Sequence, residues 1–168
     1  MNSFERVMST LQGLPTDRVP VMAVLGSYGA RLTGADLRIL YSDADAYVAG
    51  QQAVQKEFGL DLILAPFDYS AISEAFGGEV AWFDNQAPNM KRPPCRSAAE
   101  ALAYPLPDPR RTARLPIILE ATRRLAKIYG GQVPLFAAVP SPSALCVLLL
   151  GMEAWLDVLL FEDDMTKL

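Results

Sequence analysis

The sequence predicts an α/β fold built on a parallel sheet. Three nearly continuous apolar runs carry this prediction, at residues 19–25, 60–65 and 133–139. These runs lack the alternation of a strand that has one face in water, and they are typical of strands buried on both faces. Each run is followed by helical segments, which is the order expected of a parallel α/β protein.

Helical segments are predicted before, between and after these runs, because glycines, prolines and capping residues delimit them. They comprise residues 4–12, 35–41, 43–58, 70–76, 97–104, 114–129, 143–150 and 153–161. Asn2 or Ser3 caps the first helix, and Gly59 ends the third. Ser97 and Glu100 have the spacing of a capping box. Residues 162–168 resemble the first turn of a further helix.

Composition indicates one globular domain over residues 1–168. The chain is 51% hydrophobic and 20% charged with a net charge of −4, which argues against nucleic acid and anionic membranes as partners. Its most hydrophobic stretch, residues 144–152, is too short to span a bilayer, and no signal segment is predicted at its N-terminus. Two distant cysteines do not suggest a disulfide framework. We therefore expect a cytoplasmic protein.

The absence of histidine restricts the chemistry of this chain. With no histidine in the sequence, Ser-His-Asp and Cys-His catalysis are excluded within it. Two cysteines cannot supply a tetrahedral zinc site alone, so no metal site is predicted. No glycine-rich phosphate loop follows any of the predicted strands.

Three segments resemble a known superfamily. The strongest lies at residues 58–80, which read Phe-Gly-Leu-Asp-Leu-Ile-Leu-Ala-Pro-Phe-Asp-Tyr-Ser-Ala-Ile-Ser-Glu-Ala-Phe-Gly-Gly-Glu-Val. This segment is similar, without a gap, to the second-strand region of uroporphyrinogen decarboxylase, where a Phe-x-Leu-Asp opening leads to a strand, a Ser-Asp pair and a helix ending Ala-Leu-Gly-x-Glu-Val. Residues 3–20 and 133–145 are similar to other parts of the uroporphyrinogen decarboxylase and methylcobamide:thiol (coenzyme M) methyltransferase superfamily. The likeness covers essentially the whole chain.

The resemblance implies a fold larger than this chain. Superfamily members are barrels of about twice this length, so residues 1–168 are expected to be the N-terminal half of an incomplete (β/α)8 TIM barrel, with the C-terminal half absent. Three strands cannot close a barrel that needs eight, and a half sheet leaves unpaired edges. We therefore expect self-association or pairing with a C-terminal half-barrel.

One departure from the family pattern favours the methyltransferase branch. The decarboxylases carry Met-Arg-Gln-Ala-Gly-Arg after their first strand, and this chain has Val-Leu-Gly-Ser-Tyr-Gly-Ala-Arg at residues 24–31. The methyltransferase branch implies transfer of a methyl group from a methylcobamide to a thiol, with a corrinoid protein or tetrapyrrole-like ligand as partner. It also implies a zinc-thiolate site in the missing half, so this chain alone is expected to be inactive. Uroporphyrinogen decarboxylase and a non-catalytic half-barrel binding module remain alternatives.

The candidate site residues lie where the predicted strands end and helices begin, which is where parallel barrels carry their working groups. Asp68 matches the catalytic aspartate of the decarboxylases, and its alternative role is the N-cap of residues 69–76. Five further residues are candidates for substrate binding, and each has packing, capping or solvent exposure as its alternative. They are Tyr28, Arg31, Tyr69, Ser141 and Ser143.

Other polar or reactive residues have simpler interpretations. Cys95 is predicted to be a lone exposed thiol, either incidental or with a pKa lowered by its neighbours Arg92 and Arg96, and Cys146 to be a small core residue. Arg110, Arg111 and Arg114 are predicted to be solvent-exposed side chains at the start of a helix. Asp61 begins a strand, at the end of a barrel associated with stability.

Overall fold

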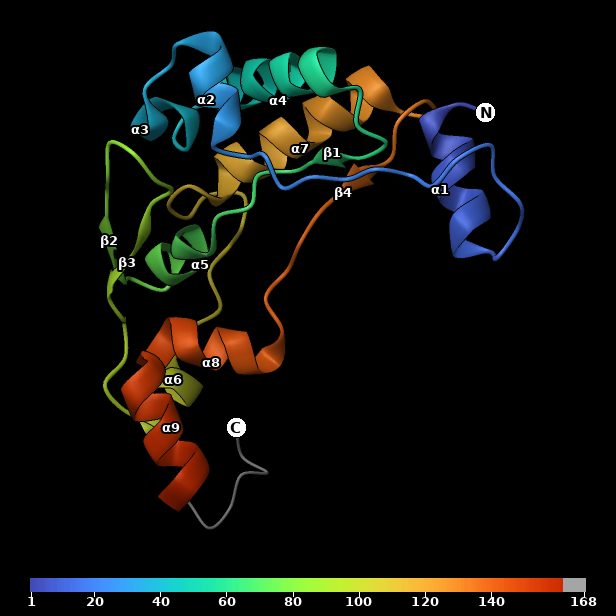
Figure 1. Cartoon of the computed structure of the whole chain (residues 1–168). Coiled ribbons are helices and arrows are strands. Elements are labelled where there is room, and N and C mark those ends of the chain that lie inside the picture. The colour runs from blue at the N-terminus through green and yellow to red at the C-terminus, as the bar shows by residue number, and fades with distance from the viewer. Residues whose placement is uncertain (162–168) are drawn as a thin grey trace. The chain divides into compact units, whose positions relative to one another are not determined.

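The computed structural model describes residues 1–161, and the chain forms two compact units (Figure 1). Unit 1 comprises residues 1–67, 84–86 and 117–138, and unit 2 comprises residues 68–83, 87–116 and those from 139 onward. The helical turn predicted for residues 162–168 lies outside the described residues.

Unit 1 holds the parallel strands and the longer helices. Its elements are α1 (Ser3–Leu11), α2 (Tyr28–Thr33), α3 (Leu37–Leu40), α4 (Ala44–Phe58), β1 (Ile63–Leu64), β4 (Leu135–Phe136) and all but the first two residues of α7 (Leu115–Tyr129). The helices predicted at residues 4–12, 43–58 and 114–129 are confirmed. Asp43 caps α4 by accepting from the Ala46 N–H at 2.8 Å, and Gly59 ends it with φ 56°.

The parallel pairing predicted for the second and third apolar runs is confirmed over two residues of each run, but the predicted burial of the third run is not, because Phe136 and Val139 are 42% and 81% exposed. β1 and β4 pair parallel, with Ile63 opposite Leu135 and Leu64 opposite Phe136. The Ile63 N–H donates to the Pro134 carbonyl at 2.9 Å. Both residues of β1 are buried beneath α4, so this strand is the apolar centre of the unit.

The first apolar run does not form the buried strand that the sequence predicts. Residues 19–25 are extended but carry no strand, and Val19, Val21 and Val24 are 78%, 53% and 63% exposed. The Asp61 N–H donates to the Val21 carbonyl at 2.8 Å, but the Val21 N–H donates to the Asp61 carboxylate instead of continuing a ladder. Pro20 has no N–H to give. Hydrophobicity alone therefore misassigned this segment.

Asp61 fastens the start of the chain to β1. The Asp61 side chain is fully buried and accepts hydrogen bonds from Arg6 Nη1 at 2.6 Å, Arg18 Nη1 at 2.6 Å and Ser3 Oγ at 2.8 Å. Burial raises the pKa of Asp61, but hydrogen bonds led by the one from Arg18 outweigh it and lower the pKa to about 2. These contacts are those of a structural anchor.

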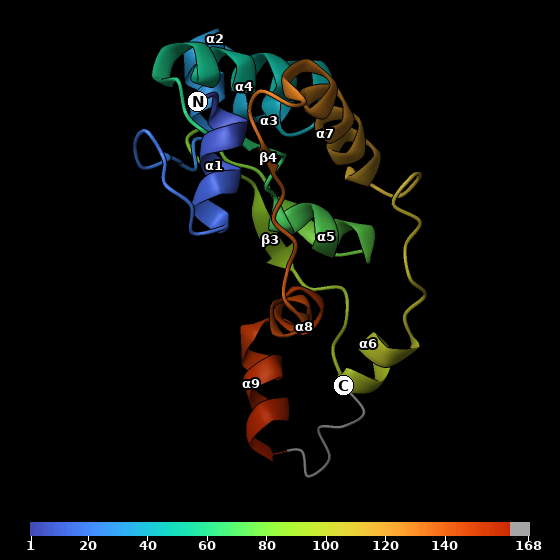
Figure 2. The ribbon, with the colours of Figure 1, turned by 90° about the vertical axis from the view of Figure 1, so that its right-hand side faces the viewer.

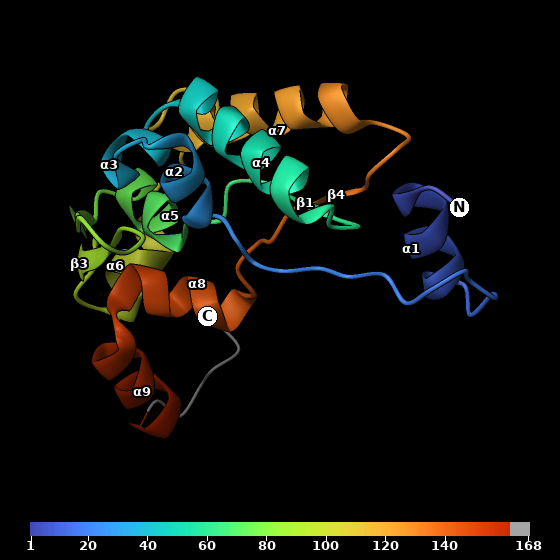
Figure 3. The same cartoon turned by 45° about the horizontal axis from the view of Figure 1, so that its top comes forward.

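The helices α2 and α4 cross closely at a pair of glycines (Figure 3). A Cβ on Gly29 would lie 2.8 Å from the Gly50 backbone, a distance that side-chain carbons do not tolerate. Because neither residue has a side chain, α2 can lie against α4. This approach holds α2, which carries two of the candidate site residues.

Unit 2 consists of short helices around an antiparallel hairpin. Its elements are α5 (Tyr69–Ala75), β2 (Glu79–Ala81), β3 (Asn89–Arg92), α6 (Ala98–Ala103), α8 (Pro142–Leu150) and α9 (Met152–Phe161). β2 and β3 pair antiparallel, and the sequence did not predict β3. Among residues 1–161, no single helix has the length and composition to cross a membrane; α8 and α9 meet both criteria only together, and they are bent by 118° (Figure 2).

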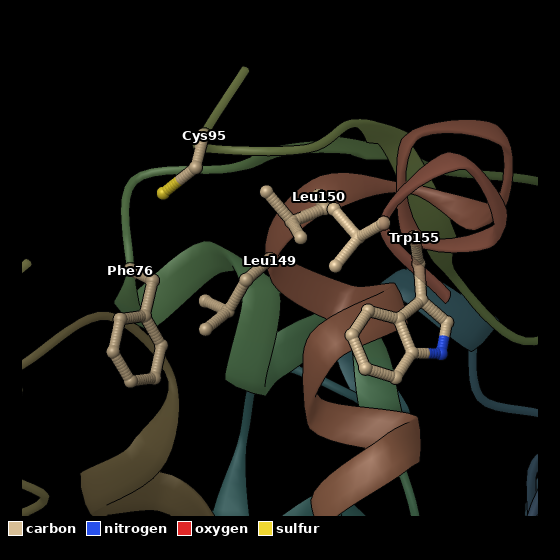
Figure 4. Close-up of a cluster of buried hydrophobic side chains, with 6 residues drawn as sticks. Phe76, Cys95, Leu149, Leu150 and Trp155 are labelled. Carbon is tan, nitrogen blue, oxygen red and sulfur yellow. The ribbon is translucent and has the colours of Figure 1, made fainter. Parts of the chain in front are cut away.

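The core of unit 2 lies where α8 and α9 meet the end of α5 (Figure 4). Its buried members are Phe76, Cys95, Leu149, Leu150, Trp155 and Val158. Cys146 packs against this cluster, as predicted. Cys95 is 2% exposed. Its N–H donates to the Leu149 carbonyl at 3.0 Å, so the loop that carries Cys95 lies against α8. The expectation of an exposed thiol was wrong.

Cys95 is expected to react slowly with thiol reagents. Burial raises the pKa of the Cys95 thiol, and the charge of Glu100 adds to this effect. In a Cys146→Ser variant, modification by dithionitrobenzoate should be at least about 100-fold slower in buffer than in guanidinium chloride, because the reacting thiolate is both scarce and covered. Equal rates in the folded and unfolded chain would contradict the buried placement.

Candidate functional site

Asp68 is held at the first turn of α5. Its Oδ1 accepts from the Ser70 N–H at 2.9 Å and from Ser70 Oγ at 2.6 Å. The side chain of Asp68 is 3% exposed, although Tyr69 beside it is 40% exposed. The capping interpretation of Asp68 is thus confirmed, and its role in a functional site stays a prediction.

Arg114 is the partner of Asp68 that the sequence did not reveal. Arg114 Nη1 forms an ion pair with Asp68 Oδ2, and Arg114 Nε donates to Glu74 Oε2 at 2.7 Å. The guanidinium carbon lies 4.7 Å from the centroid of the Trp82 ring. Arg114 is 6% exposed, so the expectation of a solvent-exposed side chain was wrong for this residue. No local sequence signal marks it, because its partners lie at least 32 positions away.

The backbone before Arg114 adopts a rare conformation. Ala113 has φ 50°, and it is the one non-glycine residue with positive φ among residues 1–161. An L-residue in this region costs about 1–2 kcal/mol relative to the right-handed conformation. Strained residues of this kind persist where surrounding contacts stabilise them. Here the adjacent Arg114 side chain, bonded to Asp68 and Glu74, supplies such contacts.

Tyr28 and Arg31 both line one pocket of unit 1, and their contact with a ligand stays a prediction. The pocket has a volume of about 610 Å³, and the Arg31 guanidinium carbon lies 5.8 Å from the Tyr28 ring centroid. Asp36, Asp84 and Asn85 also line it. None of these three residues was among the candidates from the sequence. This volume lies in the range of small-molecule sites, so the pocket can hold a small ligand or one arm of a larger one.

Ser141 and Ser143 lie at the start of α8. Ser141 Oγ caps the helix by accepting from the Ala144 N–H at 3.2 Å, which confirms its capping role. Ser143 is exposed in the first turn. Within residues 1–161, no hydrogen bond links either serine to Asp68. Ligand contact by these serines stays a prediction.

The residues of this chain do not fit the zinc site that the superfamily implies. The sequence has no histidine, and no cluster of three or more Cys, Asp or Glu residues suited to a metal occurs within residues 1–161. Burial raises the pKa of both Cys95 and Cys146, which disfavours the thiolate that zinc binds. No chemical step through zinc is therefore derived for this chain.

The parallel pair β1–β4 and the helix α4 that packs on it are consistent with part of a parallel α/β barrel. The family model described as "Uroporphyrinogen decarboxylase (URO-D)" matches residues 2–167. The chain belongs to the uroporphyrinogen decarboxylase family.

The curated relatives that match are methyltransferases. The methylcobamide:CoM methyltransferase MtaA of Methanosarcina barkeri is 23% identical over 164 residues, covering 95% of this chain and 48% of that protein. The methylcobamide:CoM methyltransferase MtbA of Methanosarcina acetivorans is 25% identical over 158 residues, covering 90% of this chain and 45% of that protein. The chain thus spans about half the length of the curated relatives it matches.

A solved structure shares the fold. A methyltransferase from Methanosarcina mazei superposes with a TM-score of 0.84 at 20% identity, covering 96% of this chain and 49% of that protein. Together with the parallel pair β1–β4, this likeness supports a partial barrel.

Proposed function

We propose that residues 1–168 form the N-terminal half of one barrel domain in a corrinoid-dependent methyltransferase, which transfers a methyl group from a methylcobamide to a thiol. The observation that carries this proposal is the match to methylcobamide:CoM methyltransferases over 90–95% of the chain. The missing decarboxylase arginine motif at residues 24–31 favours the same branch. A cytoplasmic location, without nucleic acid or membrane partners, is part of this proposal.

In this proposal, the chain's own residues bind and orient the ligand. The corrinoid, when bound, supplies the methyl group. Arg31 donates hydrogen bonds to an anionic or amide group of the ligand, and Tyr28 supports the guanidinium through its ring. In unit 2, taken separately, Asp68 at the start of α5 is the candidate contact for a proton-bearing or cationic group, and Tyr69, Ser141 and Ser143 are further candidates.

Methylcobalamin binding tests this function. Titration of the chain with methylcobalamin, followed by absorbance and calorimetry, should show saturable binding. Arg31→Met should weaken it about tenfold or more, because a charge-assisted hydrogen bond contributes about 1.5–3 kcal/mol. Arg110→Met, at an exposed arginine outside the pocket, is the matched control and should change affinity less than twofold.

Uroporphyrinogen decarboxylase is the second candidate, because Asp68 matches the aspartate of that enzyme. Saturable binding of uroporphyrinogen, lost in Asp68→Asn and accompanied by no methylcobalamin binding, would favour the decarboxylase and contradict the methyltransferase proposal. Binding of methylcobalamin by a chain that supports no turnover with any added partner would favour the non-catalytic module.

The same proposal explains the apolar side chains that are exposed in this chain. On α9, Leu156, Leu159 and Leu160 are 45%, 45% and 70% exposed, and Val19, Val21 and Val24 of unit 1 are exposed as well. The relatives are about twice as long as this chain, and a barrel needs strands on both sides of the sheet. We infer that the remaining half of the barrel covers these residues, and that a second copy can do so in its place.

A further inference from the structure

We infer that Arg114 is a positioning residue for Asp68. This inference rests on the proposed function, which gives Asp68 contact with the ligand. It assigns to Arg114 a task that neither the family match nor the resemblance provides. Arg114 belongs to a largely buried side-chain cluster in unit 2, which comprises Asp68, Ser70, Glu74, Trp82 and Arg114.

The cluster fixes both oxygens of the Asp68 carboxylate. Arg114 Nη1 pairs directly with Asp68 Oδ2. Arg114 Nη2 donates to Ser70 Oγ at 2.9 Å, and Ser70 Oγ in turn donates to Asp68 Oδ1 at 2.6 Å. One guanidinium therefore acts on one oxygen directly and on the other through a single hydroxyl. A carboxylate held at both oxygens cannot rotate about its last bond without breaking one of these contacts.

Arg114 is itself immobilised from two further directions. Glu74 Oε2 accepts from Arg114 Nε at 2.7 Å, and the Trp82 ring lies against the guanidinium face. The left-handed backbone of Ala113 turns the chain inward immediately before it. Side chains that orient a reacting group must be rigid themselves, and these contacts provide that rigidity.

The task requires an arginine and not merely a positive charge. The guanidinium is a planar fork, and in this cluster its N–H groups reach three different side chains: Asp68, Ser70 and Glu74. A lysine ammonium is a compact charge on a flexible stem and cannot reproduce that fork. A substitution that keeps the charge but loses the fork therefore separates positioning from simple charge balance.

The first measurement tests the pairing without any ligand. In ¹⁵N NMR spectra of the whole chain, the Arg114 guanidinium should give separate, slowly exchanging Nη signals, because its rotation is blocked. In Asp68→Asn the separate Nη1 signal should be lost to rapid exchange, while the Nε signal, held by Glu74, remains. Both signals should persist in Arg111→Met, a substitution at an exposed arginine. Averaged Arg114 signals in the unmodified chain would overturn the inference.

The second measurement is a double-mutant cycle in methylcobalamin affinity. Asp68→Asn and Arg114→Met should each weaken binding about tenfold, and the double variant should be no more than about twofold weaker than Asp68→Asn alone. Arg114→Lys should also weaken binding, by about fivefold. Because Arg114→Met can fail to fold, the cycle is repeated with Arg114→Lys, which keeps the charge. Additive losses in both cycles would mean a general structural role and would overturn the inference.

The two measurements separate this inference from the proposed function. If the unmodified chain binds no methylcobalamin while the separate Arg114 signals are present, the proposed function fails and the pairing of Arg114 with Asp68 is supported. If methylcobalamin binds and Arg114→Lys binds as tightly as the unmodified chain, the proposed function stands and the positioning role is overturned.

Discussion

Replacing Asp61 with asparagine is expected to lower the free energy of unfolding by about 3–5 kcal/mol, the usual cost of removing one partner from a buried ion pair. Asp61 is fully buried and accepts from Arg6, Arg18 and Ser3. The asparagine removes the carboxylate that pairs with the buried Arg6 guanidinium. Urea unfolding followed by circular dichroism measures the loss, and a change below 1 kcal/mol would contradict the anchoring role.

The same anchor has a defined pH dependence. The pKa of Asp61 is lowered from 3.8 to about 2 in the folded chain, so its stabilising contribution is present above about pH 4. The contribution is lost as the pH falls through about 2, where the folded carboxylate takes up a proton. Asp61→Asn should remove this part of the acid dependence. Arg111→Gln, at an arginine whose side chain is 87% exposed, is the control and should leave stability and its pH dependence nearly unchanged.

Self-association is the second large effect that we expect. The chain has a mass of 18.3 kDa, and light scattering coupled to size exclusion should report a dimer or larger species at micromolar concentration. Burial of exposed apolar side chains drives this association, and Val21 and Val24 together contribute about 3 kcal/mol if both are covered. Replacing both with glutamate should therefore weaken association about 100-fold or more.

A matched control comes from a different part of unit 1. Ile39 lies on α3 and is 54% exposed, so Ile39→Glu replaces an exposed apolar side chain with one glutamate outside residues 19–25. It should leave the association unchanged. A monodisperse monomer of the unmodified chain across the micromolar range would contradict the incomplete-barrel proposal.

Helices were predictable because their limits depend on neighbouring residues. The Asp43 carboxylate and the Gly59 backbone delimit α4 through contacts within three or four positions. Ser141 and Gly151 delimit α8 in the same way. A resemblance carried by short motifs also identified the family, which the match over residues 2–167 confirms.

Strands were predicted less well, because a strand is defined by a partner distant in sequence. The run at residues 60–65 lies beside β4 and is buried, whereas the equally apolar run at residues 19–25 stays exposed. Hydrophobicity shows that a segment would favour burial, and it does not show whether another strand is present to bury it.

The sequence by itself determined every helix within residues 1–161 except α2, which it did not predict. It also determined the parallel α/β class, the family and the position of Asp68 at a helix start, since each follows from local spacing or short motifs. Only the tertiary structure decided that Arg114 reaches Asp68 across 46 positions and that Cys95 is buried against α8. The physical reason is that ion pairing and burial depend on which distant segments meet in space. Contacts between distant segments leave no local pattern in the sequence.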